Sequence, residues 1–238
     1  RLSPHLRFGT IGVRRLLAEA REVWQGASPS GRASVETFVK ELAWREFYAG
    51  ILESFPRTAT ENFRREFDRF PWASGEEAER RLGAWSAGRT GYPIVDAGIR
   101  QLLAEGWMHN RVRMIAASFL TKDLLVDWRK GEAFFRRHLA DGDLASNNGG
   151  WQWAAGSGTD AQPFFRIFNP VLQGRRFDPE GAYVRAWLPE LARARTAQPA
   201  AIHAPWLLPS PPPDYPAPVV DHAVARAAAL AAFAEIRG

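Results

Sequence analysis

Residues 107–169 read WMHNRVRMIAASFLTKDLLVDW, RKGEAFFRRHL and ADGDLASNNGGWQWAAGSGTDAQPFFRIFN. The first segment has the pattern of a buried helix that carries Asn110, Arg113 and Met114 on one side, at i, i+3 and i+4. After a second helix, aspartates, asparagines, glycines and tryptophans follow one another within a few residues. Because each buried polar group needs a partner, ordinary packing does not call for this density of carboxylate, amide and indole groups. We therefore interpret the last segment as a loop that forms a functional site.

The composition is that of a folded protein without a metal centre. The chain has 238 residues, of which 46% are hydrophobic and 24% charged, enough to bury the core of one large domain or two small ones. It has no apolar run long enough for a membrane span and no signal-peptide core, so we expect a cytoplasmic setting. The absence of cysteine and of paired histidines argues against a metal site. The net charge of +5 rests mainly on arginine and favours polyanion partners such as nucleic acid.

Helical periodicity extends over most of the chain. We predict helices over residues 10–24, 34–54, 93–105, 108–126, 131–139, 181–191 and 221–237, with an irregular segment and a short helix over 62–88. Ser34 is the predicted N-cap of the second helix, Pro93 and Gly106 bound the third, and Trp128 closes the fourth. A proline-rich connector of extended character spans residues 199–218. Since no alternation predicts strands and no repeat occurs, the fold should be all-α.

The helix over 34–54 carries a mixed stripe of aromatic and charged residues. Phe38, Glu41 and Arg45 share one face, and Trp44 lies beside them. From spacing alone, an amphipathic edge with a Glu41–Arg45 pair at i, i+4 is favoured over a functional site.

Several motifs, taken in order, resemble the C-terminal flavin-binding domain of the photolyase and cryptochrome family. They are RLSPHLRFG, ELAWREFY, TGYPIVDAGIRQLLAEGWMHNRVRMIAASFLTKDLLVDW, DGDLASNNGGWQWAAGSGTD, FRIFNP and FDPEGAYVRAWLPEL. The likeness covers nearly the whole chain and is strongest to class I cyclobutane pyrimidine dimer photolyases. It implies one helical FAD-binding and catalytic domain over residues 1–238. We expect a fragment, with the family's α/β antenna domain absent from this chain.

The resemblance implies that FAD is held among helices, with reduced FADH⁻ as the active form, and that the antenna chromophore is not bound by this segment. The cofactor-binding positions that it implies are Arg1, Leu2, Ser3, Phe38, Glu41, Arg45, Asn110, Arg113, Asp141, Asp143 and Asn147. Turn chemistry is the alternative interpretation of Asp141 and Asp143, because DGD is also a good turn sequence. Asn147 matches the position that faces flavin N5, where photolyases carry Asn and plant cryptochromes Asp, and it favours repair over signalling.

The implied function is light-driven repair of cyclobutane pyrimidine dimers in UV-damaged DNA, by electron transfer from reduced FAD to a dimer flipped out of the duplex. Trp44 and Trp153 would be the aromatic walls of the dimer site, Glu41 and Asn110 its hydrogen-bonding groups and Met114 its floor. The implied electron relay is Trp151, Trp128 and Trp72, with Trp85 as the alternative surface end, and the implied DNA contacts are Arg111, Arg166 and Gln173. Arg175 and Arg176 are equally consistent with solvated surface charge.

Two other functions stay open at this point. The chain could be a cryptochrome-like blue-light photoreceptor, or a flavin-free helical fragment that binds DNA. For the repair enzyme we expect a monomer without membrane or metal partners, acting in the bacterial cytoplasm on the nucleoid.

Overall fold

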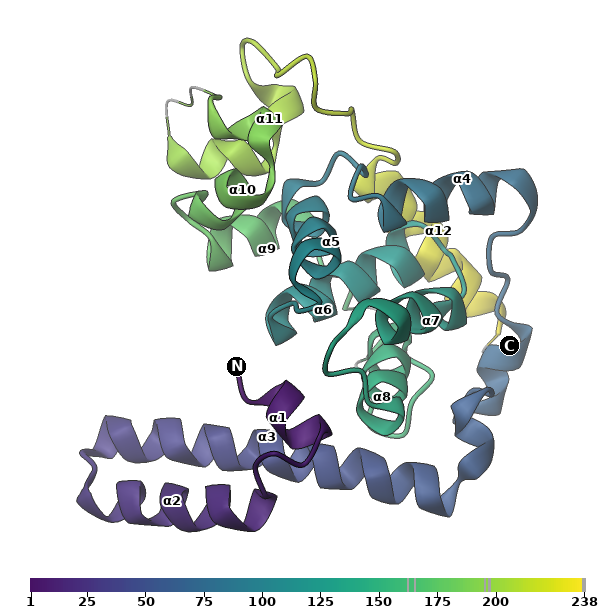
Figure 1. Ribbon diagram of the computed structural model, residues 1–238. Helices are drawn as coiled ribbons and strands as arrows, with labels where there is room; N and C mark the ends of the chain where they lie inside the picture. The colour runs from purple at the N-terminus through teal and green to yellow at the C-terminus, as the bar shows by residue number, and fades with distance from the viewer. Residues whose placement is uncertain (162, 165, 195, 197, 237–238) are drawn as a thin grey trace.

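The computed structural model describes residues 1–161, 163–164, 166–194, 196 and 198–236 (Figure 1). These residues contain no strand, and the all-α prediction is confirmed. The α-helices are α1 (Ser3–Arg7), α2 (Val13–Gly26), α3 (Pro29–Ser54), α4 (Gly75–Ser86), α5 (Pro93–Glu105), α6 (Asn110–Ser118), α7 (Trp128–His138), α8 (Leu144–Ala155), α9 (Pro170–Phe177), α10 (Ala182–Trp187), α11 (Pro189–Ala192) and α12 (His222–Glu235). The shorter elements are the 3₁₀ helices η1 (Pro56–Ala59), η2 (Arg65–Arg69), η4 (Pro199–His203) and η5 (Pro205–Leu207), and the π-helix η3 (Phe119–Asp123).

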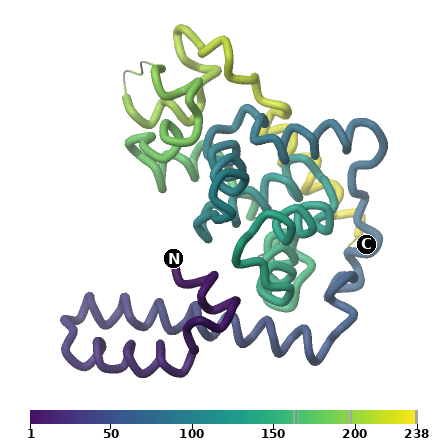
Figure 2. Tube along the Cα trace, in the orientation of Figure 1, coloured from purple at the N-terminus to yellow at the C-terminus, as the bar shows by residue number. Residues whose placement is uncertain are grey.

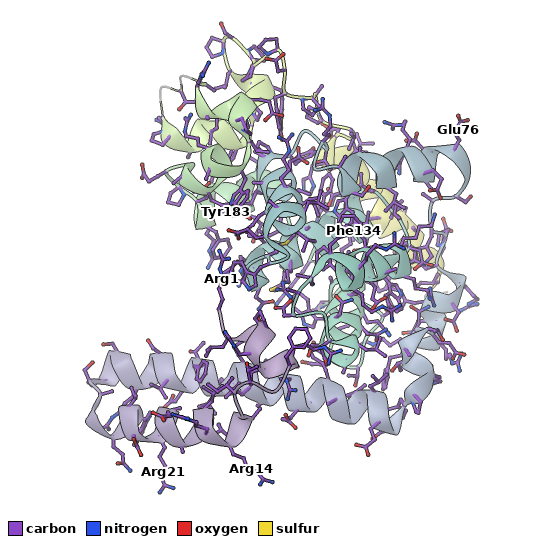
Figure 3. All side chains as sticks on the ribbon, viewed as in Figure 1. Arg1, Arg14, Arg21, Glu76, Phe134 and Tyr183 are labelled. Carbon is purple, nitrogen blue, oxygen red and sulfur yellow. The ribbon has the colours of Figure 1, made fainter. Side chains whose placement is uncertain are left out.

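The helices α2 and α3 form a hairpin that stands out from the rest of the molecule (Figure 1). Figure 3 shows Arg14 and Arg21 of α2 pointing away from the body. The predicted start of α3 at Ser34 is wrong, because the helix begins at Pro29 and the Ser28 hydroxyl accepts a hydrogen bond from the Gly31 amide at 3.3 Å. Proline at the first helical position has its φ preset and gives up no hydrogen bond, so Ser-Pro is itself a start signal.

The helix α5 lies at the centre of the core, in contact with α4, α6, α9 and α10. Pro93 starts it, and Gly106 ends it in the left-handed conformation at φ 64°, as predicted. Its buried Asp96 accepts hydrogen bonds from the amide and hydroxyl of Thr90, each at 2.7 Å, and from the Tyr215 hydroxyl. Burial raises the pKa of Asp96, and these donors satisfy its oxygens.

The helix predicted over 108–126 is shorter and ends in a π-helical turn. It begins at Asn110, and η3 closes with the Leu124 amide bonded to the Phe119 carbonyl at 3.0 Å. Leu125 follows with φ 54° and stops the helix. Trp128 does not close this helix but starts α7, where the Asp127 carboxylate accepts a hydrogen bond from the Arg129 amide at 2.9 Å.

The segment predicted as a site loop folds as the helix α8. Asp143 is its N-cap and accepts a hydrogen bond from the Ser146 amide at 2.9 Å, and Gly156 ends it at φ 92°. Glycine and asparagine are poor helix formers, which is why the sequence predicted a loop. Tertiary hydrogen bonds from Asn148 and Gln152 to the segment after α3 offset that poor propensity.

The C-terminal third of the chain packs back onto the core. The helix predicted over 181–191 is two short helices, since Pro189 disfavours helical geometry at Leu188. The connector over 199–218 contains η4 and η5 and is not extended throughout. Asp221 caps α12 through the Val224 amide at 2.9 Å, whereas position 237 of the predicted helix lies outside the described residues. Figure 2 shows the end of the chain beside the segment after α3, where Arg69 donates a hydrogen bond to the Ile236 carbonyl at 3.4 Å.

Within the part of the chain that the structure describes, none of the helices combines the length and apolar character that crossing a membrane requires.

All four tyrosines of the chain should titrate abnormally. Burial, the largest cause in each case, raises the pKa of Tyr48 and Tyr92 to about 12 and the pKa of Tyr183 and Tyr215 above the ordinary value. Because the unfolded chain ionises its phenols near pH 10, the folded state should lose stability as the pH rises above about 10. We expect a spectrophotometric titration to show no phenolate midpoint near pH 10 in the folded protein. The same chain in guanidinium chloride should show one, and a native midpoint near 10 would contradict the described burial.

Candidate functional site

A cavity of about 440 Å³ lies between α3, α6, α8 and the turn before α8. Small-molecule and cofactor sites have volumes of roughly 300–1,000 Å³, so the cavity has the size of such a site. The predicted site residues that line it are Glu41, Trp44, Arg45, Asn110, Arg111, Arg113, Met114, Asp141, Asp143, Asn147, Trp151 and Trp153. Residues far apart in the sequence thus come together around one space.

One wall of the cavity is fixed by an ion pair between α6 and the turn before α8. The Arg113 Nη2 atom donates to both carboxylate oxygens of Asp141, at 2.8 and 3.1 Å, and its Nε atom donates to the Met108 carbonyl at 2.7 Å. The Asp141 side chain is 3% exposed and that of Arg113 is 25% exposed. The arginine is therefore held in one orientation, with its charge balanced at the cavity wall.

The two predicted aspartates have different structural roles. Asp141 forms the ion pair, whereas Asp143 is the N-cap of α8. Between them, the Gly142 carbonyl accepts a hydrogen bond from Arg7 Nε at 2.8 Å, which ties the turn to α1. Both carboxylates still line the cavity, so turn chemistry and cofactor contact are compatible here.

The orientation of Asn147 is set by Glu132 of α7. Asn147 Nδ2 donates to the Glu132 backbone carbonyl at 3.0 Å and to Glu132 Oε1 at 2.9 Å. A backbone carbonyl only accepts hydrogen bonds, so the amide nitrogen must face Glu132. Asn147 Oδ1 has no hydrogen-bond partner among the described residues and is left as a free acceptor.

Trp151 forms the deep end of the cavity. It is 2% exposed, and its Nε1 atom is buried without a partner among the described residues. Its ring packs edge-on against Phe135, with centroids 4.9 Å apart, and against Trp85 at 6.0 Å. A Cβ atom at Gly131 would fall 2.1 Å from Trp151 Cη2, so only glycine fits there.

The aromatic side of the cavity is formed by Trp44 of α3 and Trp153 of α8. Trp44 is 38% exposed and its ring stacks on Tyr48. Arg45 forms an ion pair with Glu46 at 2.9 Å. The predicted Glu41–Arg45 pair does not occur among the described residues. Glu41 is thus available to the cavity.

Several predicted positions do not line the cavity. Arg1 pairs with Glu105 at 3.0 Å and lies over the Trp107 ring, beside the end of α5 (Figure 3). Leu2 and Ser3 are at the start of the short α1, and Phe38 is half-buried on α3. Their assignment to the cofactor stays a prediction.

The predicted relay tryptophans occupy three environments. Trp128 is buried, and its Nε1 atom donates to Asn62 Oδ1 at 2.9 Å, while Trp72 is half-buried against Phe70 with centroids 4.4 Å apart. Among the described residues, no ring contact joins Trp151 to Trp128, whereas one joins Trp151 to Trp85. Trp85 is fully buried and donates to the Ala116 carbonyl at 3.0 Å, so it is not placed as a surface end.

Of the predicted DNA contacts, Arg111 lines the cavity, whereas Gln173 and Arg166 are not among its lining residues. Arg111 lies over the Phe177 ring at 4.6 Å. Gln173 of α9 is half-buried, with an Oε1 atom that has no partner among the described residues, and Arg166 is exposed. Arg176 also lies over Phe177, at 5.2 Å.

Sequence reasoning missed Glu132 and made no assignment for Tyr48. Glu132 is spaced at i+4 from the buried Trp128 and i−3 from the buried Phe135, so a carboxylate in a buried stripe was the available signal. Tyr48 lies on the stripe of Glu41 and Arg45, but spacing alone could not say what it touches.

Residues 38–235 match the family described as FAD binding domain of DNA photolyase, and the chain belongs to this family. It is 51% identical to the deoxyribodipyrimidine photo-lyase of Halobacterium salinarum, over all of this chain and 50% of that protein. A bacterial class III photolyase from Agrobacterium tumefaciens superposes with a TM-score of 0.91 at 46% identity, over 99% of this chain and 49% of that one. The cryptochrome of Synechocystis sp. PCC6803 matches with a TM-score of 0.86 at 34% identity, over 97% and 48%.

The chain spans about half the length of the curated relatives that it matches. The family match and the structural superposition confirm the predicted family and its helical FAD-binding fold. Because a class III photolyase is so similar, the particular likeness to class I enzymes stays a prediction.

Removing Asp141 should destabilise the fold. Asp141→Ala leaves the Arg113 charge unpaired at the cavity wall, and we expect a loss on the order of 2 kcal/mol, less than for a fully buried pair because Arg113 is partly exposed. Urea unfolding followed by circular dichroism measures it. Glu19→Ala, which breaks the exposed Arg15–Glu19 pair of α2, should leave the midpoint unchanged. Equal midpoints for all three proteins would show that the Arg113–Asp141 pair does not stabilise the fold.

Proposed function

We propose that this chain is the FAD-binding, catalytic half of a deoxyribodipyrimidine photo-lyase that repairs cyclobutane pyrimidine dimers in UV-damaged DNA. The observation that carries the proposal is the cavity in which Asn147, Trp151, Trp44 and Trp153 meet. Family membership and the names of the relatives support the same activity. Several functional classes share this fold, so the activity is inferred from the site and not from the fold alone.

The residues present fit FAD. The cavity offers N–H donors on the Arg45 and Arg113 guanidinium groups, each also paired with a carboxylate, and a free amide oxygen on Asn147 that would accept a hydrogen bond from a ring N–H. Trp151 Nε1, buried and unpaired among the described residues, indicates a wall made to contact another group. When bound, FAD supplies the light absorption and the redox chemistry of the reaction. Because a neutral amide at Asn147 has no acidic proton to give, the residue favours repair over signalling.

The open side of the cavity suits a flipped-out pair of bases. Trp44 and Trp153 present aromatic faces on which pyrimidines would pack, a contact of ~1–3 kcal/mol per base. Glu41 and Asn110 would form hydrogen bonds with the base edges, and Met114 would fill the floor. Arg111 and Arg166 would pair with phosphates around the lesion, which makes affinity salt-dependent.

Trp151 would supply an electron to the cofactor in a separate photoreduction step, with Trp128 behind it. Trp72 is half-buried and suits the surface end better than Trp85, which is fully buried. Trp151 contacts Phe135 and Trp85 in the described part of the chain, and of these two rings the indole of Trp85 is the one that could take part in the same step.

The test of the proposed function is a repair assay. With FAD bound and chemically reduced, the chain should remove cyclobutane dimers from an irradiated oligonucleotide under blue light and leave them intact in the dark. Chromatography of the oligonucleotide measures the loss. No repair by the reduced, flavin-loaded protein would refute the activity. Light-dependent flavin chemistry without repair would support a photoreceptor, and no flavin bands after reconstitution would support a DNA-binding fragment.

Trp151→Phe should separate photoreduction from repair. We expect the rate of photoreduction of bound FAD to fall at least tenfold, because the proposed electron donor is removed; a tenfold change corresponds to about 1.4 kcal/mol in the barrier. Repair by the chemically reduced protein should be unchanged. Transient absorption and the repair assay measure the two steps. Trp24→Phe changes an exposed tryptophan of α2 and should alter neither. Equal loss of both activities in Trp151→Phe would contradict the separate roles.

A further inference from the structure

The ring of Tyr48 occupies the space that a side chain at position 149 would fill. Tyr48 belongs to α3 and Gly149 to α8, and the two helices are in contact. A Cβ atom built on Gly149 would lie 2.1 Å from Tyr48 Cδ1 and 2.4 Å from Cε1, closer than real Cβ atoms approach any neighbour. Any residue other than glycine at position 149 would have to displace the tyrosine ring.

Tyr48 in turn supports Trp44, the exposed aromatic wall of the cavity. The two rings stack with centroids 5.6 Å apart and an interplanar angle of 29°. The other ring contact of Trp44 among the described residues is the edge of Phe47 at 5.4 Å, and Phe47, which is 39% exposed, itself rests edge-on against Tyr48 at 5.5 Å. The position of the Trp44 ring therefore depends on Tyr48 more than on Phe47.

The contact with α8 matters because, apart from its chain neighbours α2 and η1, α3 packs chiefly on α8. Leu42 is the one residue of α3 that is fully buried, in a helix of 26 residues. Tyr48 and Ile51 border a second, small cavity of about 20 Å³ that is lined from α8 by Gly149 and Gln152. Gln152 is fixed by hydrogen bonds to the segment after α3, so α8 is the rigid side of this contact.

We propose that Tyr48 and Gly149 form a socket that sets the gap between Trp44 and Trp153, which makes Tyr48 a positioning residue for recognition of the damaged dinucleotide. The inference rests on the proposed function, because it needs the two tryptophans to face a flipped-out dinucleotide. Trp153 lies one turn after Gly149 on α8, and Trp44 lies one turn before Tyr48 on α3. The same helix contact that holds the socket therefore sets the distance between both walls.

The ring and not the hydroxyl of Tyr48 performs this role. Burial, followed by the charges of Asp160 and Glu41, raises the pKa of Tyr48 to about 12, so the phenol is uncharged at neutral pH. No hydrogen bond of the hydroxyl occurs within the described residues. Tyr48→Phe should accordingly behave as the unmodified protein, whereas Tyr48→Ala should not.

Fluorine NMR of the flavin-loaded chain labelled with 5-fluorotryptophan tests the socket without reference to repair. The Trp44 resonance is identified by its loss in Trp44→Phe. We expect Gly149→Ala and Tyr48→Ala each to shift or broaden this resonance. Gly50→Ala on α3 is the matched control, because a Cβ atom there meets nothing within 4 Å, and it should leave the resonance unchanged. An unchanged Trp44 resonance in both Gly149→Ala and Tyr48→Ala would overturn the socket.

Binding to a dimer-containing oligonucleotide and to its undamaged counterpart tests the positioning role. We expect Gly149→Ala and Tyr48→Ala to lose about tenfold in preference for damage, the order expected for one stacking contact, at unchanged flavin content. Tyr48→Phe and Gly50→Ala should retain the preference. If the Trp44 resonance moves but the preference stays, the positioning role is wrong. If the unmodified chain shows no preference for damage, the proposed function fails, and the NMR result still decides the socket.

A double-mutant cycle distinguishes an effect that acts through the tyrosine ring from a general loss of folding. If Gly149→Ala acts through the tyrosine ring, it should have little further effect in a Tyr48→Ala background, where the ring is gone. Additive effects on the Trp44 resonance and on damage preference would show that Gly149→Ala acts by another route.

Discussion

The side-chain amide of Gln152 holds the site together. It is buried in α8, where Nε2 donates to the carbonyls of Thr58 and Glu61 at 3.0 and 3.1 Å, and Oε1 accepts a hydrogen bond from the Phe63 amide at 2.9 Å. These backbone groups lie in η1 and in the chain that follows it, and leaving one of them buried and unpaired would cost about 1–3 kcal/mol. The helix α8 therefore cannot slide or turn without breaking several bonds at once. The positions of the α8 side chains that face the cavity therefore depend on this amide.

The cavity consequently has one rigid wall and one adjustable wall. On the rigid side, Arg113 is held by Asp141 and Asn147 by Glu132, each through two hydrogen bonds, on helices that are packed into the core. Groups that must meet a cofactor within a fraction of an ångström belong on such elements. On the other side, α3 is largely exposed, and its aromatic surface depends for its position on the contact of Tyr48 with Gly149. If the proposed function holds, the chemistry and the recognition of DNA fall to walls of different stiffness.

The sequence alone predicted the elements whose signals are local. Pro93 and Gly106 bound α5 as expected, because a fixed φ and a left-handed cap act within one turn. It failed for α8, whose helix depends on hydrogen bonds to residues some 90 positions away, such as Gln152 to Thr58. Spacing also favoured a surface edge for Glu41 and gave no role to Glu132. The family resemblance predicted Glu41 as a site residue, whereas the contact of Glu132 with Asn147 was found in the structure.

The contacts that α8 makes on several sides restrict the number of residues in this helix. Asn147 and Trp151 point to the cavity, Asn148 and Gln152 bond to the segment after α3, and Gly149 receives the Tyr48 ring. A helix turns about 100° per residue, so one inserted or deleted residue between Asn147 and Gln152 would send each of these groups to a neighbour's partner. A single substitution disturbs one of these contacts, whereas a change of length disturbs several at once. Relatives that keep this site should therefore keep the number of residues in α8.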